Sequence, residues 1–251
     1  MRAACRLAAE ILRKTAREVK IGVSTKEVND AAARFMEESG CKSAFFGYRQ
    51  RTGGPAFPGH ICISLNEEIV HGIGRANRII QNGDIVKIDV GIVKDGWVGD
   101  NATTVPVGMV DPKILQLLRA TEESLHVAID YARRGEQLKK LCGSVEKCVN
   151  QFGYRVVREF VGHGVGRQLH EDPQVPNWPD PRIKVRLQPG MILAIEPMVN
   201  MGTDQVTVLG DDWTVITQDR QPSAHFEHTV LVTDGEPEIL TWRERLTAPV
   251  T

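Results

Sequence analysis

Hydrophobic positions recur along this chain with two periods, one typical of helices and one typical of strands. Residues 3–19 carry apolar side chains at helical spacing, which predicts an amphipathic helix. The run Ser24-Thr25-Lys26-Glu27 matches a capping box for a second helix, and Gly40 is suited to end it. Two more helices are predicted over about 111–134 and 137–152, the first opening on an N-cap aspartate and a proline.

A period of two predicts strands, most clearly over residues 84–93. Its two faces carry Val86, Ile88, Val90 and Ile92 on one side, and Ile85, Lys87, Asp89 and Gly91 on the other. Asp95-Gly96 is a hairpin signal, which predicts a return strand over 97–107. Shorter runs predict strands at 61–65, 154–160, 191–199 and 226–233, and Gly- or Pro-rich stretches predict loops at 48–59 and 171–181.

Two pairs of glycines repeat the same spacing. Gly22 and Gly40 bracket one predicted helix and Gly135 and Gly153 bracket another, each pair 18 residues apart. Each pair is preceded by a helix and followed by strand-like sequence, which indicates two related helix–helix–strand halves. Halves that share a sheet leave a cleft where they meet, and a cleft is a natural place for a site. Because no linker separates them, we expect one α+β domain over residues 1–251.

The composition narrows the class of protein. With 251 residues, 41% hydrophobic, 25% charged and a net charge of −1, the chain can bury a sizeable core and has no basic footprint for nucleic acid. No apolar run approaches the roughly 20 residues of a membrane span, and no signal-peptide pattern opens the chain. The cysteines are scattered, without a CxxC pair, so we expect them to be reduced in a cytoplasmic protein: Cys5, Cys41, Cys62, Cys142 and Cys148. Cys62 is expected to act as a small buried hydrophobe.

Four carboxylates lie in apolar, strand-like stretches: Asp89, Asp100, Glu196 and Glu227. Asp89 and Asp100 are 11 residues apart across the Asp95-Gly96 turn, so a hairpin can bring both side chains to one face. Two acids side by side repel each other unless a cation lies between them. Oxygen and imidazole nitrogen donors without a thiolate suit a pair of divalent cations. The chain is therefore expected to be a metal-dependent hydrolase.

Three histidines beside or near glycines add to this set: His71, His163 and His170. The glycines on both sides of His163 let the backbone approach closely and leave its imidazole unobstructed. Together with the four acids, these histidines predict one polar cleft with apolar walls. By strand alternation, His225 shares the face of Glu227, whereas His228 points away from it.

An ordered set of motifs then carries a resemblance: Asn66…Val70-His71-Gly72, Lys87-Ile88-Asp89-Val90, Gly99-Asp100, Gly162-His163-Gly164-Val165-Gly166, His170-Glu171-Asp172-Pro173, Ile195-Glu196-Pro197 and Glu227-His228-Thr229. With these motifs the chain resembles the type I methionine aminopeptidases, from the first helices to Leu240. The resemblance implies the pita-bread fold, in which two pseudo-symmetric halves surround a curved antiparallel sheet flanked by helices. It also implies removal of the N-terminal methionine from nascent proteins and peptides, with preference for a small second residue.

The resemblance implies a role for each acid. Asp89 would chelate one divalent metal ion, and His163 with Glu196 would bind the other. Asp100 and Glu227 would bridge the two ions, and a hydroxide shared between them would attack the first peptide bond. Four carboxylates balance the charge of two divalent cations. Such a donor set accepts Co²⁺, Mn²⁺, Fe²⁺ or Zn²⁺.

The same resemblance assigns the substrate contacts. His170 would hydrogen-bond the scissile amide region or the developing oxyanion, His71 would help to protonate the leaving amine, and Glu196 would shuttle the proton of the water. The methionine pocket would consist of Phe45, Tyr48, Phe57, Leu169 and Trp213. Asn66 and Ser223 match residues around a monovalent cation, so one such ion is also expected. The chain departs from the family pattern at Arg49–Pro55, an insertion in the pocket loop, at Trp97-Val98 and at Leu169, which concerns the shape of the pocket.

The implied partners are nascent polypeptides and peptides with a free N-terminal methionine. A monomer with transient ribosome contact is expected, without nucleic-acid or membrane binding of its own. Two alternatives stay open, a pita-bread aminopeptidase of the Xaa-Pro type and a non-catalytic peptide-binding module. The first would carry a large extra N-terminal domain, and the second would have lost metal ligands.

Overall fold

The computed structural model describes residues 1–50 and 53–244, which form helices and antiparallel strands. The helices are α1 (Arg2–Ala16), α2 (Thr25–Glu38), α3 (Pro112–Asp130) and α4 (Leu138–Asn150). The first strands are β1 (Lys42–Ser43), β2 (Cys62–Leu65), β3 (Glu68–Val70), β4 (Ile85–Lys94) and β5 (Trp97–Pro106). The later strands are β6 (Arg155–Val156), β7 (Gly162–Gly164), β8 (Glu171–Val175), β9 (Ile192–Ile195), β10 (Met198–Asn200), β11 (Val206–Val208), β12 (Val215–Thr217), β13 (Ser223–His225), β14 (His228–Leu231) and β15 (Glu238–Ile239).

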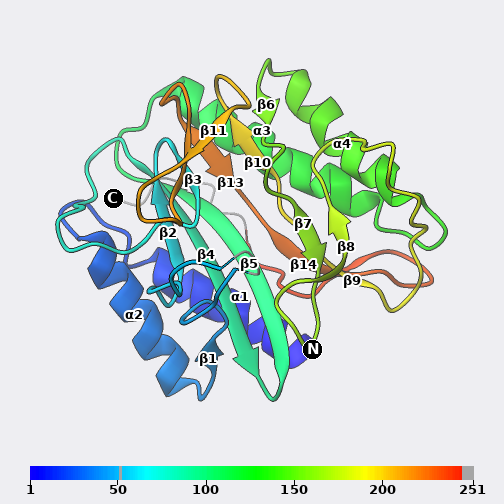
Figure 1. The fold of residues 1–251 in the computed structure, drawn as a ribbon, viewed down its shortest axis with the longest axis horizontal. Coiled ribbons are helices and arrows are strands. Elements are labelled where there is room, and N and C mark those ends of the chain that lie inside the picture. The colour runs from blue at the N-terminus through cyan, green and yellow to red at the C-terminus, as the bar shows by residue number, and fades with distance from the viewer. Residues whose placement is uncertain (51–52, 245–251) are drawn as a thin grey trace.

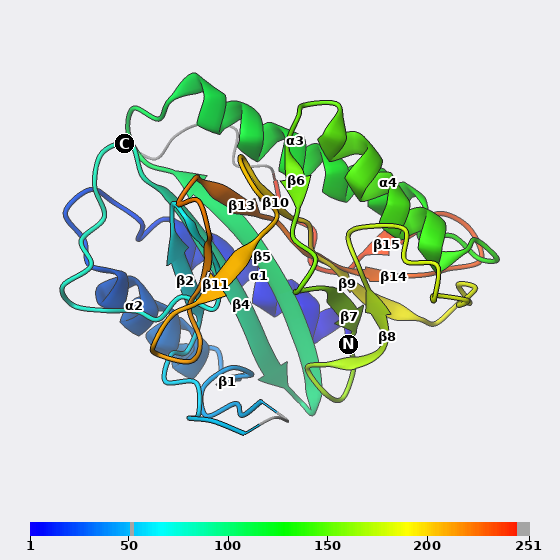
Figure 2. The same cartoon turned by 45° about the horizontal axis from the view of Figure 1, so that its top comes forward.

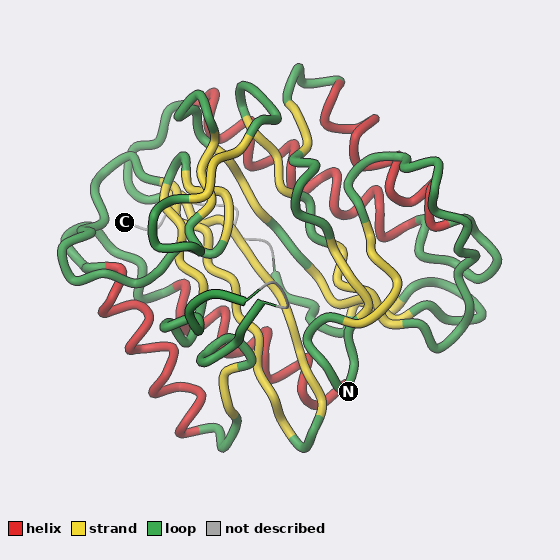
Figure 3. Tube along the Cα trace, viewed as in Figure 1, coloured by secondary structure: helices red, strands yellow, loops and turns green. Residues whose placement is uncertain are grey.

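The helices lie on the outer sides of the strands, one pair on each half of the molecule (Figures 1 and 3). α1 packs on β4 and β5, and α2 packs on α1 and β2, around an apolar cluster that includes Ile11 and Ile88. α3 packs on α4 and on β10 and β13, around a second cluster that includes Leu117 and Val199 (Figure 2). Within the described residues, no helix is both long and apolar enough to cross a membrane.

The predicted helix starts are confirmed by their hydrogen bonds. Ser24 Oγ accepts from the backbone N of Glu27 at 3.2 Å, and the Glu27 carboxylate accepts from the backbone N of Ser24 at 2.8 Å. This reciprocal capping box satisfies two of the free N–H groups that every helix start leaves. At α3, Asp111 Oδ1 accepts from the backbone N of Lys113 at 2.7 Å, just ahead of a proline in the first turn.

The glycine repeat also has a structural basis. Gly22, Gly40, Gly135 and Gly153 all adopt left-handed backbone, with φ of 88°, 60°, 79° and 80°. Such backbone lets a chain leave or enter a helix without a Cβ clash. The residues just before α2 and α4 form matching isolated bridges, Ser24 with Ile79 and Gln137 with Arg186. The repeated spacing therefore marks the same helix–helix unit twice.

The β4–β5 hairpin positions two of the acids. Its ladder pairs Asp89 with Ala102 and Gly91 with Asp100, on either side of the predicted turn. Residues directly opposite in an antiparallel pair share a face, so Asp89 and Asp100 are diagonal neighbours on the same face. This confirms the side-chain alternation predicted for residues 84–93.

Two predicted strands are interrupted. The run 191–199 divides into β9 and β10, with Glu196 and Pro197 between them. Proline has no N–H to donate to a ladder, so it breaks the pairing at this point. The run 226–233 contains β14, which begins only at His228, so Glu227 also precedes a strand. These breaks in strand pairing matter because Glu196 and Glu227 then need not follow the alternating side-chain directions of a strand.

Two other expectations need correction. The run 154–160 forms only the short strand β6, because the backbone then leaves the sheet towards β7. The predicted loop 171–181 is wrong over β8, which pairs with β7 despite Pro173. β8 is the outer strand of its sheet, and a proline is tolerated at such an edge because one side of the strand needs no partner.

Candidate active site

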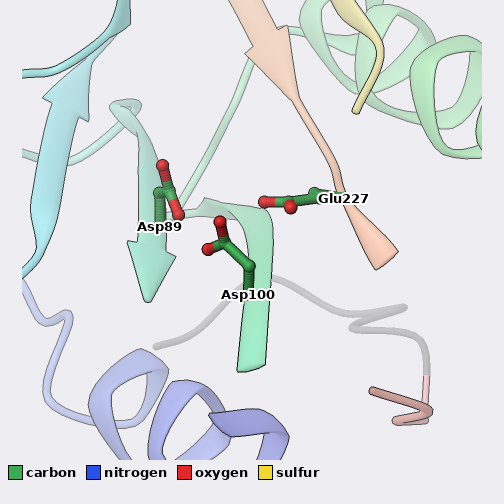
Figure 4. Close-up of side chains that lie close together, drawn as sticks. All are labelled: Asp89, Asp100 and Glu227. Atoms are coloured by element: carbon green, nitrogen blue, oxygen red, sulfur yellow. The ribbon is translucent and has the colours of Figure 1, made fainter. Parts of the chain in front are cut away.

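Three carboxylates from different parts of the chain converge at the interface of the two halves. Asp89 comes from β4, Asp100 from β5 and Glu227 from the segment before β14, and their carboxylates point toward one another (Figure 4). One oxygen of each lies within 4.8 Å of the others. Asp89 Oδ1, Asp100 Oδ1 and Glu227 Oε1 are buried without a hydrogen-bond partner among the described residues. Buried acids at this spacing need a positive charge between them.

His163 and Glu196 complete the predicted ligand set. His163 Nε2 lies 3.4 Å from Glu196 Oε1 and 3.9 Å from Asp100 Oδ2. Its Nδ1 lies 2.9 Å from the carbonyl oxygen of Gly164. Because a carbonyl only accepts, Nδ1 carries the proton and the lone pair of Nε2 faces the acids. The imidazole is therefore already oriented as a metal ligand.

The electrostatics show that this group is unfavourable as four bare anions. Burial raises the pKa of Asp100 to about 7 and raises that of Asp89 well above its usual range, with the Asp100 charge adding to the effect. Burial and the neighbouring acids also raise the pKa of Glu196 and Glu227. Burial lowers the pKa of His163 to about 3, which keeps it in the neutral, ligand-competent form. The donors thus fit divalent metal ions.

The two glutamates of the second half are fixed through their backbone. The Glu196 carbonyl accepts from Asn177 Nδ2 at 3.1 Å. The Glu227 carbonyl accepts from Arg243 Nη1 at 3.2 Å, and the same guanidinium donates to the carbonyl of Ala102 at 2.7 Å. Ala102 also accepts from the backbone N of Glu227 at 3.0 Å. Side chains from neighbouring segments therefore hold the backbone of these acids where strand pairing does not.

The two histidines beside Glu227 behave as strand alternation predicts. His225 is buried, and its Nε2 lies 3.5 Å from Glu196 Oε2 on the side of the acids. His228 instead faces away, where its Nδ1 lies 3.1 Å from Thr241 Oγ1 and 3.3 Å from Arg243 Nη1. His225 is thus next to Glu196 on the side of the acids, whereas His228 is buried on the opposite side.

One cavity of about 350 Å³ joins the acids to the predicted substrate contacts. Its lining includes every residue predicted for the divalent metals and for the substrate: Phe45, Tyr48, Phe57, His71, Asp89, Asp100, His163, Leu169, His170, Glu196, Trp213 and Glu227. The volume is within the usual range of small-ligand sites, about 300–1,000 Å³. The acids form one wall and the aromatic side chains form another.

The aromatic wall is built from edge-to-face contacts. Trp213 meets Phe57 at a centroid distance of 5.1 Å, Tyr48 at 6.5 Å and His71 at 6.3 Å. Phe45 lies over Gly91, where an added Cβ would come within 2.5 Å of its ring. Gly91 faces Asp100 across the hairpin, so the missing side chain lets an aromatic ring approach the acid cluster.

His170 connects the two walls. Its Nδ1 lies 2.8 Å from the Tyr48 hydroxyl, and its ring meets the His163 ring edge-on at 4.4 Å between centroids. The exposed His170 therefore lies beside the predicted metal ligand His163 and against the aromatic wall. His71, with left-handed backbone at φ 58°, lies on another wall of the cavity. Burial and His170 lower the pKa of His71 to about 4.

The site also contains residues that the sequence did not assign to it: Gln50, Cys62, Val70, Phe160, Val161 and Met198. Cys62 is a buried hydrophobe as expected, and it also lines the cavity because β2 places it opposite Asp89. The sequence could not show this, because only the pairing of β2 with β4 puts both side chains on one face. Phe160 was not foreseen because it follows β6 in irregular backbone, where it contacts His71.

The remaining predicted residues lie elsewhere. Asn66 and Ser223 are not among the residues that line the cavity, and their backbone carbonyl oxygens both accept from Lys87 Nζ. The predicted insertion Arg49–Pro55 lies partly outside the described residues, and Gln50 at its start borders the cavity.

Comparisons with known proteins identify the family. The model of metallopeptidase family M24 matches residues 1–234. The chain is 44% identical over 241 residues to methionine aminopeptidase 1 of Bacillus subtilis strain 168, covering 96% of this chain and 94% of that one. The crystal structure of methionine aminopeptidase from Thermotoga maritima superposes with a TM-score of 0.91 at 40% identity, covering 97% of this chain and 95% of that one.

A more distant likeness concerns the fold alone. The prolidase from Pyrococcus horikoshii OT3 matches with a TM-score of 0.75 at 23% identity, covering 98% of this chain but only 62% of that one. The α+β pita-bread fold implied by the sequence is therefore confirmed. With its acid cluster, neutral His163 and near full-length relatives, the chain belongs to metallopeptidase family M24, among the methionine aminopeptidases.

Proposed function

We propose that this protein removes the N-terminal methionine from peptides and nascent proteins. The observation that carries the proposal is the single cavity in which the acid cluster faces an aromatic wall. Asp89 would hold one divalent ion, and His163 and Glu196 would hold the other. Asp100 and Glu227 would contact both ions. When bound, such ions lower the pKa of water to near neutrality and polarise the carbonyl of the scissile bond.

The protein's own side chains then act on the substrate. The Glu196 carboxylate lies between His163 and His225 and is placed to take a proton from the attacking water and return it to the leaving amine. In the His170 tautomer that carries its proton on Nε2, Nδ1 would accept from the Tyr48 hydroxyl 2.8 Å away, and Nε2–H would serve the developing oxyanion. His71, neutral near pH 7, contacts the substrate amide.

The aromatic wall supplies the specificity. Phe45, Phe57 and Trp213 are at least nine-tenths buried, and an unbranched thioether makes favourable contacts with aromatic edges. Cys62 adds a polarizable atom to the same cavity. A free α-amino group would lie near the acids, which would restrict cleavage to N-terminal residues. We also propose a preference for a small second residue, as the family resemblance implies.

We further propose that the working enzyme is a monomer in the cytoplasm, acting on nascent chains with transient contact to the ribosome. The net charge of −1 supports the lack of nucleic-acid binding of its own. The metal donors, all oxygen or imidazole nitrogen, support Mn²⁺, Fe²⁺, Co²⁺ or Zn²⁺ as the cofactors, two per chain.

The test measures release of methionine from a Met-Ala-Ser peptide by metal-stripped protein reloaded with Co²⁺, Mn²⁺, Fe²⁺ or Zn²⁺. Matched controls are the N-acetylated peptide, which lacks the free amine, and an Ala-Pro-Ser peptide, which an Xaa-Pro enzyme would cleave. We expect release only from the free Met-Ala-Ser peptide. Absence of methionine with every metal would overturn the proposal, and cleavage of Ala-Pro-Ser alone would establish the Xaa-Pro alternative.

A further inference from the structure

Behind the acid cluster, a buried ammonium group lies between two backbone carbonyl oxygens. Lys87 is in the middle of β4 and is only 2% exposed. Its Nζ donates to the carbonyl of Asn66 at 2.6 Å and to the carbonyl of Ser223 at 2.9 Å. A buried cation costs several kcal/mol unless oxygen atoms replace its water, as these two carbonyls do.

The two segments that carry these carbonyls are held together independently of the lysine. Asn66 has left-handed backbone, at φ 49°, which an asparagine tolerates better than most residues. Its side-chain Oδ1 accepts from the backbone N of Ile85 at 3.0 Å, and its Nδ2 donates to Asp84 at 2.9 Å. The backbone N of Ser223 donates to the Asn66 carbonyl at 3.0 Å. The turn after β2 and the start of β13 therefore form a preorganised pair of carbonyls.

Nearby charges oppose the cost of burial. Burial lowers the pKa of Lys87 to about 7, and the carboxylates of Glu68, Glu67 and Asp84 act in the opposite direction. The strand partner opposite Lys87 in β5 is Thr104, whose hydroxyl bonds to the backbone of His225. The surroundings of Lys87 are thus polar on the side of β13 and acidic on the side of the β2–β3 turn.

We propose that Lys87 is a tethered cation, which takes the place of the monovalent metal ion expected at Asn66 and Ser223. Backbone carbonyl oxygens are the ligands that alkali ions use in proteins. The same two oxygens here already share one positive charge. An alkali ion bound to both would have to occupy the space of Lys87 Nζ and would be repelled by it.

The tethered cation would fix three elements that lead into the active site. Lys87 is two residues before Asp89 on β4, Asn66 is in the turn before β3 and His71, and Ser223 is two residues before His225. Because the charge is covalently attached, its occupancy does not depend on the salt in the medium. We therefore expect the protein to be equally stable in salts of sodium, of potassium and of a bulky organic cation.

Three variants test this inference without any catalytic readout. Lys87→Ala removes the ammonium and leaves room for an ion, whereas Lys87→Met removes the charge but fills the space. Lys94→Ala is the matched control, because Lys94 lies on the same strand and its Nζ also bonds two carbonyls, Ser39 at 3.2 Å and Gly40 at 2.9 Å, but nearer the surface. The melting temperature of each chelator-treated protein is measured in NaCl, KCl and tetramethylammonium chloride at equal ionic strength.

For wild type, Lys94→Ala and Lys87→Met, we expect the melting temperature of each protein to be the same in all three salts. Among these three proteins, Lys87→Met should have the lowest melting temperature. Lys87→Ala should melt roughly 5 °C higher in NaCl or KCl than in tetramethylammonium chloride, through binding of the small ion. A wild type that melts higher in NaCl or KCl would overturn the inference. So would a folded Lys87→Ala variant without preference among the salts. The wild-type comparison decides the question even if Lys87→Ala does not fold.

Discussion

The two halves of the molecule present their acids in different ways. The first half holds Asp89 and Asp100 inside a hairpin whose strands pair without interruption over ten residues each. The second half holds Glu196 and Glu227 at points where strands stop, between β9 and β10 and between β13 and β14. Register fixes Asp89 and Asp100 in the first half, whereas in the second half the backbone of Glu196 and Glu227 is held by contacts such as those from Asn177 and Arg243. The second half should therefore respond more sharply to changes around its ligands.

The largest effects should come from the ligands themselves, equally in both halves. Asp89→Asn in the first half and His163→Ala in the second should each lose metal and reduce methionine release about 1,000-fold or more. Metal content by mass spectrometry and kcat/KM on Met-Ala-Ser check this. An active, metal-replete variant at either position would overturn the ligand assignment.

The effect of Asp100 on stability should depend on whether metal is bound. In metal-free protein, Asp100→Asn should raise the melting temperature, since it removes one of several mutually repelling buried acids. With metal present, the same variant should melt below wild type because a bridging ligand is lost. The sign of the change thus reverses on metal removal. A variant that lowers the melting temperature in both conditions would mean that the acids do not repel each other in the metal-free state.

Glycine substitutions test the difference in rigidity. At Gly162 an added Cβ would lie 2.3 Å from the Ala194 carbonyl, a backbone atom, so Gly162→Ala should cost about 2–3 kcal/mol and displace His163. At Gly91 the Cβ would meet only the Phe45 ring, so Gly91→Ala should raise KM roughly tenfold and leave metal binding intact. Denaturant unfolding and metal titration distinguish the two. Equal loss of metal affinity in both would remove the contrast between the halves.

Arg243→Met should have a smaller effect, confined to the second half. The side chain keeps its apolar stem but no longer holds the Glu227 carbonyl, so metal affinity should fall about 10- to 100-fold. Isothermal titration with Mn²⁺ measures it. Arg133→Met, which removes a surface ion pair with Glu236, is the control and should leave the affinity unchanged.

The smallest effect is expected where the halves touch across the cavity. Tyr48→Phe removes one hydrogen bond to His170 and should reduce kcat about fivefold, with metal content unchanged. Steady-state kinetics on Met-Ala-Ser, with metal content measured on the same sample, check this. A drop in bound metal would instead show that Tyr48 supports His163 through the His170 ring, which meets the His163 ring edge-on.

Local pattern predicted those features that short-range physics determines. The capping box at Ser24, the glycine ends of α2 and α4 and the alternation around Asp89 each follow from a few neighbouring residues. The pairing of β8 did not, because an edge strand with a proline has the composition of a loop. The division of residues 191–199 was also missed, although Pro197 was visible in the run.

In the site, too, local sequence predicted some features and missed others. The acids and histidines of the site could be recognised from their apolar or glycine-rich surroundings and their order in the chain, and the structure brings them into one cavity. Lys87 was placed on the face of Asp89, but its role was not foreseen. Its partners are backbone carbonyls of Asn66 and Ser223, and a carbonyl has no signature in a sequence. The contacts of Ser223 with Asn66 and Lys87 exist only after the two halves have come together.

The contacts between the two halves also bear on the order of folding. The predicted metal ligands come from both halves, and many of the contacts that join the halves link residues more than a hundred positions apart, as Arg243 to Ala102 and Lys87 to Ser223 do. Contacts of such long sequence separation form late, because closing long loops costs entropy first. Each half can therefore nucleate around its own helix pair, while tight coordination must await their docking. The rate at which the visible absorption of bound Co²⁺ appears would then report the final step of refolding.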